Sequence, residues 1–453
     1  MRQLQQKTIY EALGRDPVHP FPARMAPEIA LRVMSEFDRS RVLDPMAGSG
    51  TVLALARAQR HSGVGFDVDP LAVLIAKVWT RAHDVDKVRN GAHRVLHQSL
   101  SDFRNLSLGE AYPDGADETS QFIRYWFDGY ARRQLTCLAS NIRFERCENT
   151  RDALWCAFSR LIISKQSGAS RAMDLSHSRP HRVFATAPEK PFNKFLDAVE
   201  RVIGNVIDKR ETDRGPATVI KLGDARALNV PDESIDLTLT SPPYLNAIDY
   251  IRCSKFSLVW MGHNIGDLRR IRSGSIGAES GSESAIDDDR EIRGIIDTLR
   301  LRPKLNRRYQ RILGKYIDDM RSAIAEVGRV LSPGGMAVYV VGENMVHGTY
   351  IRTSVIVRKL AELAGLSLKE RRTRMLPTNR RYMPPPSAGH CSRPARCSGW
   401  RIGGSSPGTF TGHQTARRAL GPASTSRPRH GVSGSPALAK LPSRQKGGLS
   451  WAS

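Results

Sequence analysis

The sequence predicts an α/β protein built on a doubly wound, mostly parallel sheet with a long helical insertion. Strands and glycine-rich turns alternate with helices over residues 41–81, and the alternation returns over residues 217–341. The intervening stretch, 88–215, is mostly helical in pattern and too long for a bare loop. Sheets of this kind bind ligands at the carboxyl ends of their strands, so functional residues are expected directly after the predicted strands.

Two strands are predicted before the insertion. Arg41–Asp44 is a short apolar strand that enters the turn 45–50, and residues 51–59 continue as a helix. Gly63–Asp67 is a second strand that ends on an acid, and a helix follows over 70–81. Each unit is a strand, a turn and a helix, which is the repeating unit of a doubly wound sheet.

The same pattern resumes after the insertion. Ala217–Leu222 and Ile235–Thr240 are predicted strands, and the second runs straight into two prolines. Met320–Leu331 is a predicted helix that the sequence SPGG (332–335) ends, and Met336–Val341 is a fully apolar strand.

Charge is the strongest signal in the composition. The 453 residues carry a formal net charge of +24, which favours a polyanionic partner, most often nucleic acid. Residues 1–370 hold 54 Lys and Arg against 45 Asp and Glu, whereas residues 371–453 hold 15 Lys and Arg and no acid. No apolar run approaches the roughly 18 residues of a membrane span, and the first 20 residues have no apolar stretch of the kind that a secretory signal carries, so we do not expect export. Six cysteines without a CxxC pair predict reduced thiols, so we expect a cytoplasmic protein without metal.

A glycine-rich turn directly follows the first strand, with the sequence Asp44-Pro45-Met46-Ala47-Gly48-Ser49-Gly50-Thr51. Such glycines let a ligand approach the backbone, and the next helix N-terminus favours a polar or anionic group. The second strand ends at Asp67, where a carboxylate can accept hydrogen bonds from both ribose hydroxyls. No lysine follows Gly50, so the turn is not a Walker P-loop, and an adenine nucleoside is the favoured ligand.

A second motif, Ser241-Pro242-Pro243-Tyr244, directly follows the strand that ends at Thr240. The successive prolines fix φ and remove two backbone N–H groups, which leaves rigid carbonyl acceptors at this strand end. We predict that these acceptors face the cleft at the carboxyl edge of the sheet.

These two motifs together resemble those of the class I, S-adenosylmethionine-dependent amino-methyltransferases of DNA, which methylate N4 of cytosine or N6 of adenine. His19–Met25 (HPFPARM) resembles the segment that closes over the methionine part of their cofactor, and Asp224 matches their acid near its adenine. Leu331–Val341 matches their late helix-turn-strand. The resemblance implies S-adenosylmethionine as cofactor, held by Phe21, Asp44, Pro45, Ala47, Gly48, Ser49, Gly50, Thr51, Asp67 and Asp224.

The resemblance covers residues 19–85 and 217–386 and implies a seven-stranded sheet. It divides the chain into a cofactor-binding half (1–87), an insertion that is a candidate for target recognition (88–215), a catalytic half (216–386) and a basic tail (387–453). The final strand should follow Pro386, but the tail has no strand-like run, so we expect that strand to be missing. Two interpretations of the tail stay open: a disordered basic arm that holds nucleic acid, or translation in a shifted reading frame.

The reaction that this family catalyses explains the Ser-Pro-Pro-Tyr motif. The lone pair of an exocyclic amino group is conjugated into the base, so the nitrogen is a poor nucleophile. Acceptors at Ser241 and at the Pro242 carbonyl would bind the two amino hydrogens and turn the lone pair toward the methyl carbon. The target base must leave the duplex, and Tyr244 is expected to stack on it. The catalytic residues are thus Ser241, Pro242, Pro243 and Tyr244.

Several functional alternatives stay open. Ser241 favours cytosine N4, but adenine N6 remains possible on the same turn. An RNA amino-methyltransferase is a second alternative, and a nucleic-acid-binding protein with impaired catalysis is a third, because the final strand is missing from the expected sheet. The leading hypothesis is a DNA methyltransferase that acts on double-stranded DNA and belongs to a restriction or phage-defence system.

Two basic segments are candidate DNA contacts. A compact loop at 176–182 suits phosphates or base edges, and a basic helix at 290–316, broken at Pro303, suits a phosphate clamp. The alternative for both segments is a solvated surface. The candidate residues are His177, Arg179, His181, Arg182, Arg307 and Arg308.

Overall fold

In the computed structural model the described residues are 8–22, 24–111, 117–176, 180–210, 215–245, 251–278, 289–346, 348–375 and 396–404, the last segment by its backbone. All of them belong to one compact unit, residues 1–406. None of the helices in these segments is long and apolar enough to cross a membrane.

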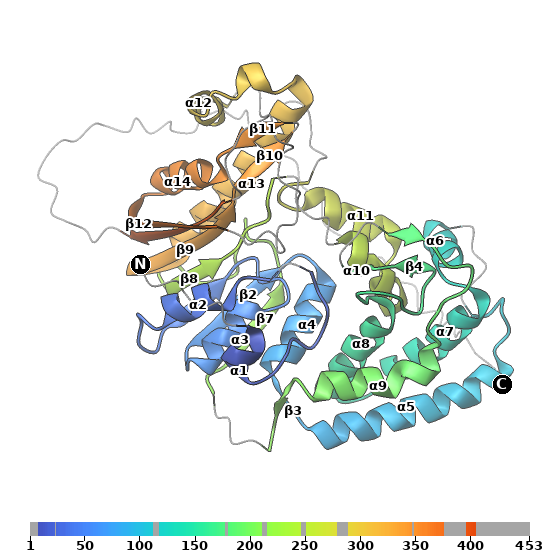
Figure 1. Ribbon diagram of the computed structural model, residues 1–453. Coiled ribbons are helices and arrows are strands. Elements are labelled where there is room, and N and C mark those ends of the chain that lie inside the picture. The colour runs from blue at the N-terminus through green and yellow to red at the C-terminus, as the bar shows by residue number, and fades with distance from the viewer. Residues whose placement is uncertain are drawn as a thin grey trace, which may run out of the picture. The chain divides into compact units, whose positions relative to one another are not determined.

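The centre of the sheet is five parallel strands in the order β7-β2-β1-β8-β9 (Figure 1). Their bounds are Thr218–Leu222 (β7), Ser62–Asp67 (β2), Arg41–Asp44 (β1), Ile235–Thr240 (β8) and Leu331–Gly342 (β9). Val42 of β1 is in register with Gly63 on one side and with Leu237 on the other. The carboxyl ends of β1, β2 and β8 therefore lie at one edge of the sheet, which confirms the predicted α/β fold with a mostly parallel sheet.

Alternating residues of these strands supply two separate cores, because successive side chains point to opposite faces. Val42, Leu237 and Val340 pack with helices α2 (Pro27–Met34) and α3 (Thr51–Ala58). Leu43 and Tyr339 belong instead to a second core, which includes α12 (Arg290–Thr298), α13 (Arg307–Val330) and α14 (Thr353–Leu363). Helices thus cover both faces of the sheet. The break predicted at Pro303 is present, because the short 3-10 helix η2 (Arg302–Lys304) separates α12 from α13.

Two antiparallel strands extend the sheet beyond β9, namely β12 (Leu366–Met375) and β13 (Arg396–Gly404). β13 lies between β9 and β12: Trp400 is in register with Tyr339 on one side and with Arg371 on the other. The expectation that no strand follows Pro386 is therefore wrong. Its pairing to both neighbours uses backbone N–H and C=O groups, which do not depend on an apolar run in the sequence of the strand.

The insertion is mostly helical, as predicted. Its helices are α5 (Val85–Asn105), α6 (Glu118–Trp126), α7 (Gly129–Arg143), α8 (Glu148–Ile162) and α9 (Pro191–Ile203). It begins and ends at a small parallel pair, in which Ala82 and His83 of β3 are in register with Ile207 and Asp208 of β6. A hairpin of β4 (Ala172–Met173) and β5 (His181–Arg182) lies within it.

The remaining elements connect these parts. Helix α4 (Pro70–Thr80) follows β2, with Asp69 as its N-cap and Pro70 in its first turn. Helix α1 (Ile9–Leu13) precedes α2, and α10 (Ile251–Leu258), the 3-10 helix η1 (Val259–Met261) and α11 (Ile265–Gly274) follow β8. A short hairpin of β10 (Asn344–Val346) and β11 (Thr349–Ile351) follows β9.

Candidate active site

The two sequence motifs meet at the carboxyl edge of the sheet. β1 and β8 are neighbouring parallel strands, and the Thr240 hydroxyl at the end of β8 donates to Asp44 Oδ1 at the end of β1 over 2.7 Å. Both residues are almost fully buried. The glycine-rich turn and the Ser-Pro-Pro-Tyr turn thus leave the sheet from two strand ends that are bonded to each other.

The glycine-rich turn is shaped by two residues with positive φ, Gly48 at 51° and Gly50 at 85°. A Cβ on Gly50 would lie 2.7 Å from the Ala76 Cβ, so this glycine allows α3 and α4 to pack closely. A Cβ on Gly48 would meet no atom within 4 Å, so open space lies over that part of the turn. The backbone N–H of Gly48 donates to Asp67 Oδ2 over 2.8 Å, which ties the turn to the end of β2.

Two hydroxyls beside this turn are buried without a hydrogen-bond partner among the described residues: those of Ser49 and Thr51. Both side chains are at most 4% exposed. A buried polar atom without a partner costs free energy, so such an atom at a helix N-terminus points to a ligand that supplies the bond. Open space over Gly48 and unpaired hydroxyls at the start of α3 fit a nucleoside cofactor.

Three carboxyl groups lie close together at this edge. Burial raises the pKa of Asp44 to about 7, against the lowering effect of its bond from Thr240. Burial also raises the pKa of Asp69 to about 7 and raises that of Asp67. No described ion pair includes any of the three. Burial disfavours the ionised form of each of these carboxyl groups. A positively charged ligand beside them would stabilise the ionised forms.

The Ser-Pro-Pro-Tyr turn is held by β9 and α13. The Ser241 hydroxyl donates to the Val340 carbonyl over 3.1 Å, which leaves its lone pairs as acceptors. No described residue donates to the Pro242 carbonyl. The ring of Tyr244 lies against the backbone of Gly342, where a Cβ would be 3.0 Å from Tyr244 Cε1. Tyr244 is 36% exposed, so part of its ring is accessible.

Tyr316 is a residue of this site that the sequence did not reveal. It is almost fully buried on α13, and its hydroxyl donates to the Pro243 carbonyl over 3.1 Å. Its spacing on an amphipathic helix marks it only as a core residue, and no local pattern links it to a turn 73 residues earlier. This bond orients the Pro243 carbonyl, which directly follows the Pro242 carbonyl that is expected to contact the base.

Asp224 is placed differently from the other predicted cofactor residues. It follows β7, and Gly223 beside it donates to the Asp67 carbonyl over 3.0 Å, so the segment lies next to the end of β2. Its carboxylate is paired with Arg226 over 2.6 Å, and Arg226 also contacts Asp319 over 2.5 Å. The side chain is therefore near the site but already engaged by a guanidinium.

The predicted DNA contacts divide between two surfaces. His181 and Arg182 are exposed on β5, where the Arg182 guanidinium lies 5.1 Å from the centre of the Tyr125 ring. Arg307 and Arg308 are exposed at the start of α13, nine and eight residues before Tyr316 and so about 12–13 Å from it along the helix axis. His177 and Arg179 lie outside the described residues.

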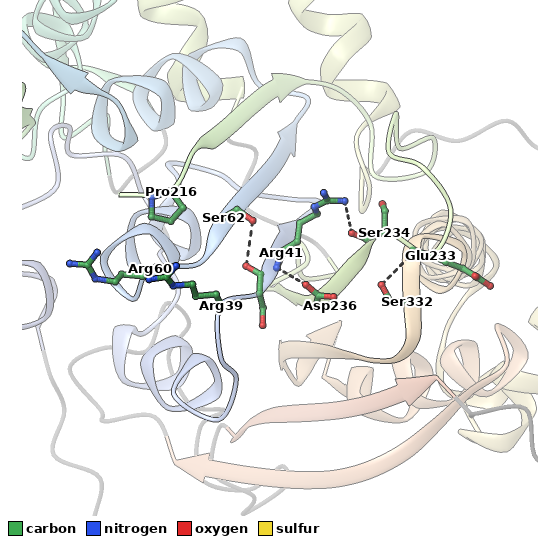
Figure 2. Close-up of a pocket in the computed structure, with 10 residues that line it drawn as sticks. Arg39, Arg41, Arg60, Ser62, Pro216, Glu233, Ser234, Asp236 and Ser332 are labelled. Atoms are coloured by element: carbon green, nitrogen blue, oxygen red, sulfur yellow. Dashed lines mark hydrogen bonds between the residues drawn. The ribbon is translucent and has the colours of Figure 1, made fainter. Parts of the chain in front are cut away.

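A surface cavity of about 650 Å³ lies at the other edge of the sheet, where strands begin (Figure 2). It is lined by Arg39, Ser40, Arg41, Arg60, Ser62, Pro216, Glu233, Ser234, Asp236 and Ser332. The Arg41 backbone donates to Asp236 Oδ2 over 2.7 Å, and its guanidinium donates to the Ser234 carbonyl over 2.9 Å. Because these residues stand at strand starts, the cavity is distinct from the two motifs.

No group of three His, Cys, Asp or Glu side chains in the described segments is arranged to hold a metal ion. Among the cysteines whose side chains the structure describes, Cys137, Cys147, Cys156 and Cys253 are free thiols.

Sequence comparison finds relatives of one kind, although no known family model matches the chain. The type II methyltransferase M.MvaI of Kocuria varians is 22% identical over 371 residues, which cover 76% of this chain and 80% of the relative. M.BsoBI of Geobacillus stearothermophilus is 21% identical over 59% of this chain and 57% of its own length. M.AvaI of Anabaena variabilis is 28% identical over 73% of this chain and 74% of its own length.

Structural comparison gives weaker likenesses. A SAM-dependent methyltransferase of Methanosarcina mazei aligns with a TM-score of 0.30 and 8% identity, over 83% of this chain and 97% of that one. An rRNA methyltransferase of Streptomyces viridochromogenes aligns with a TM-score of 0.29 and 10% identity, over 89% of this chain and 95% of that one. TM-scores this low carry no argument about function.

Proposed function

We propose that this chain is a DNA methyltransferase that transfers a methyl group from S-adenosylmethionine to an exocyclic amino group of a base. The observation that carries the proposal is the hydrogen bond between Thr240 and Asp44, which brings the glycine-rich turn and the Ser-Pro-Pro-Tyr turn to one edge of the sheet. The similarity to type II methyltransferases over three quarters of the chain supports it independently.

The cofactor is S-adenosylmethionine, which supplies a methyl group activated by a positively charged sulfur. The turn from Asp44 to Thr51 holds it through backbone groups and the unpaired hydroxyls of Ser49 and Thr51. Asp67 accepts hydrogen bonds from the ribose hydroxyls with the lone pairs that its bonds to Gly48 and Asp69 leave available. The three buried acids at this edge favour a cationic ligand.

The Ser-Pro-Pro-Tyr turn activates the base. One amino hydrogen bonds to Ser241 Oγ, whose own proton already bonds to the Val340 carbonyl, and the other bonds to the Pro242 carbonyl. The nitrogen lone pair then points at the methyl carbon. A nitrogen–carbon bond forms as the carbon–sulfur bond breaks, its electron pair passes to sulfur, and the nitrogen later loses a proton to solvent. Both acceptors stabilise the positive charge that develops on nitrogen.

We further propose that the modified atom is N4 of cytosine, because Ser241 offers a neutral acceptor rather than a carboxylate. Adenine N6 is the alternative on the same geometry. The base is flipped out of the duplex and stacks on the accessible part of the Tyr244 ring.

The remaining parts of the proposal concern the DNA and the cell. The exposed side chains of His181, Arg182, Arg307 and Arg308 contact the duplex, and His177 and Arg179, close to the first pair in the sequence, are further candidate contacts. The chain acts in the cytoplasm with a restriction system, since its relatives are type II methyltransferases.

Mass spectrometry of nucleosides tests this proposal. Unmethylated genomic DNA is incubated with the full chain and S-adenosylmethionine and then digested to nucleosides. N4-methylcytosine supports the proposal in full, and N6-methyladenine supports the reaction while correcting the base. Formation of 5-methylcytosine would overturn the mechanism, and methylation of structural RNA but not of DNA would overturn the substrate.

A further inference from the structure

One face of helix α8, in the insertion, contacts the loop that precedes the first strand. Ser159 Oγ hydrogen-bonds to His19 Nε2 over 3.0 Å, and Arg160 Nη1 donates to the Val18 carbonyl over 2.8 Å. The sulfur of Cys156, one helical turn earlier, lies 4.0 Å from the oxygen of the Val18 carbonyl. Residues three and four positions apart share one helix face, so α8 presents a continuous polar edge to this loop.

The contact continues to the segment after the Ser-Pro-Pro-Tyr turn. Ser159 Oγ lies 2.8 Å from Ser257 Oγ on α10, and one turn earlier on α10 the Ser254 hydroxyl donates to Asp69 Oδ2 over 2.5 Å. Ser159 and Ser257 are fully buried, and His19 is 1% exposed. Ser159 therefore joins three segments that are far apart in sequence: the loop at His19, the insertion and α10.

The loop itself is braced around Phe21. The Arg24 guanidinium donates to the His19 carbonyl and closes the loop on itself. Phe21 is 5% exposed and belongs to the same core cluster as Ala54 of α3 and Leu71 of α4, early in the helices that begin after β1 and β2. A shift of this loop would therefore disturb the packing beside the proposed cofactor site.

The buried bonds are sensitive to the loss of one member. Burial, with Arg160 and Arg24 nearby, lowers the pKa of His19 well below its usual range, so the imidazole is neutral near pH 7. His19 Nδ1 already lacks a hydrogen-bond partner among the described residues. Without Ser159 both ring nitrogens of the neutral imidazole would be unpaired, which favours arrangements of the loop that let water reach the ring.

We propose that Ser159 and Arg160 are positioning residues that hold Val18 and His19, and with them Phe21, in place beside the proposed cofactor site, so that these contacts with the insertion help to set the affinity for S-adenosylmethionine. This inference rests on the proposed function. Neither residue touches the reacting atoms. They act by keeping the loop in its binding-competent arrangement, and apparent affinity falls in proportion to the fraction of molecules in that arrangement.

The test compares Ser159→Ala with Ser99→Ala in the full chain. Ser99 is a matched control because it is also a fully buried serine of the insertion and accepts a hydrogen bond, from Asn141 over 3.2 Å. We expect Ser159→Ala to raise the Kd and the KM for S-adenosylmethionine about 3- to 10-fold, the range for one lost hydrogen bond. Its kcat at saturating cofactor and its KM for DNA should stay within about twofold of wild type. Ser99→Ala should leave all four values unchanged.

The outcomes separate the two proposals. If wild-type protein shows no binding of S-adenosylmethionine by calorimetry, the proposed function fails. If the wild type binds but Ser159→Ala binds within about twofold of it, or loses kcat with an unchanged KM, the positioning role is wrong. Melting curves establish that each variant folds. If Ser159→Ala does not fold, Arg160→Gln carries the same expectation, and Arg160→Lys should restore part of the affinity because its ammonium can still donate to Val18.

Discussion

Replacing Ser241 by alanine tests the part of the mechanism on which the proposed reaction depends most. The hydroxyl has two functions in the structure: it donates to the Val340 carbonyl over 3.1 Å, and its lone pairs remain available to an amino hydrogen of the base. The first bond concerns the folded state and is worth about 0.5–1.5 kcal/mol. The second concerns the transition state, where deleting one such partner costs about 2.7–4 kcal/mol. We therefore expect a small loss of stability and a loss of turnover of about 100- to 1,000-fold.

Ser234→Ala is the matched control for this experiment. Ser234 precedes the same strand at its other end, and its hydroxyl also donates to a backbone carbonyl, that of Pro231, over 2.7 Å. Single-turnover rates are measured as methylated nucleoside formed on unmethylated DNA at saturating cofactor. Ser234→Ala should retain wild-type rates, and Ser241→Asp should retain some activity because a carboxylate also accepts the bond. A loss below about 10-fold in Ser241→Ala, or an equal loss in Ser234→Ala, would refute the role given to Ser241.

Three further predictions address the cofactor and the DNA. Asp67→Ala should weaken S-adenosylmethionine binding about 10- to over 100-fold in calorimetry, because it removes charge-assisted bonds to the ribose; an unchanged Kd would exclude Asp67 from the site. Because burial raises the pKa of Asp44 from 3.8 to about 7, the folded state binds this proton more tightly than the unfolded state, and this group makes stability fall as pH rises through that range. A cationic cofactor offsets the effect, so it should raise Tm more near pH 8 than near pH 5.5, and an equal rise at both would contradict this account. Deleting residues 405–453 removes seven Lys and Arg and no acid but keeps β13, so the salt dependence of DNA affinity should weaken while site preference, measured by competition, stays the same.

The parts of the fold with local signals could be predicted from the sequence. The strands Arg41–Asp44 and Ile235–Thr240 have the predicted bounds, because short apolar runs end at a glycine-rich turn and at two prolines. The single helix Arg307–Val330 takes the place of two predicted helices, namely the part of the basic helix 290–316 that follows Pro303 and the helix predicted from Met320. The charged residues in the first turns of this helix obscure the amphipathic pattern in the sequence, although the apolar face of the helix is buried. Residues 332–335 (SPGG), a predicted helix stop, are part of β9.

The contacts that join distant segments had no such signal. Tyr316 and Pro243, or Ser159 and His19, meet only after the chain has folded, and although Pro243 and His19 stand in recognised motifs, Tyr316 and Ser159 do not. The pairing of Asp224 with Arg226 was equally hidden, although the two lie two residues apart, because a family match suggests a ligand role and gives no information about competing partners. Strand β13 was missed because its position depends on two open neighbours rather than on its own composition.

The small parallel pair of β3 and β6 brings the two ends of the insertion together. Ala82 and Ile207 are in register, so the chain enters and leaves the insertion at neighbouring positions. A segment whose ends adjoin can be exchanged between proteins without moving the strands on either side, as domain insertions at such sites show. Recombination could therefore replace the insertion and leave the strands of the sheet unchanged. The bonds of α8 to Val18 and His19 limit this freedom, since an exchanged module would have to present equivalent donors to that loop.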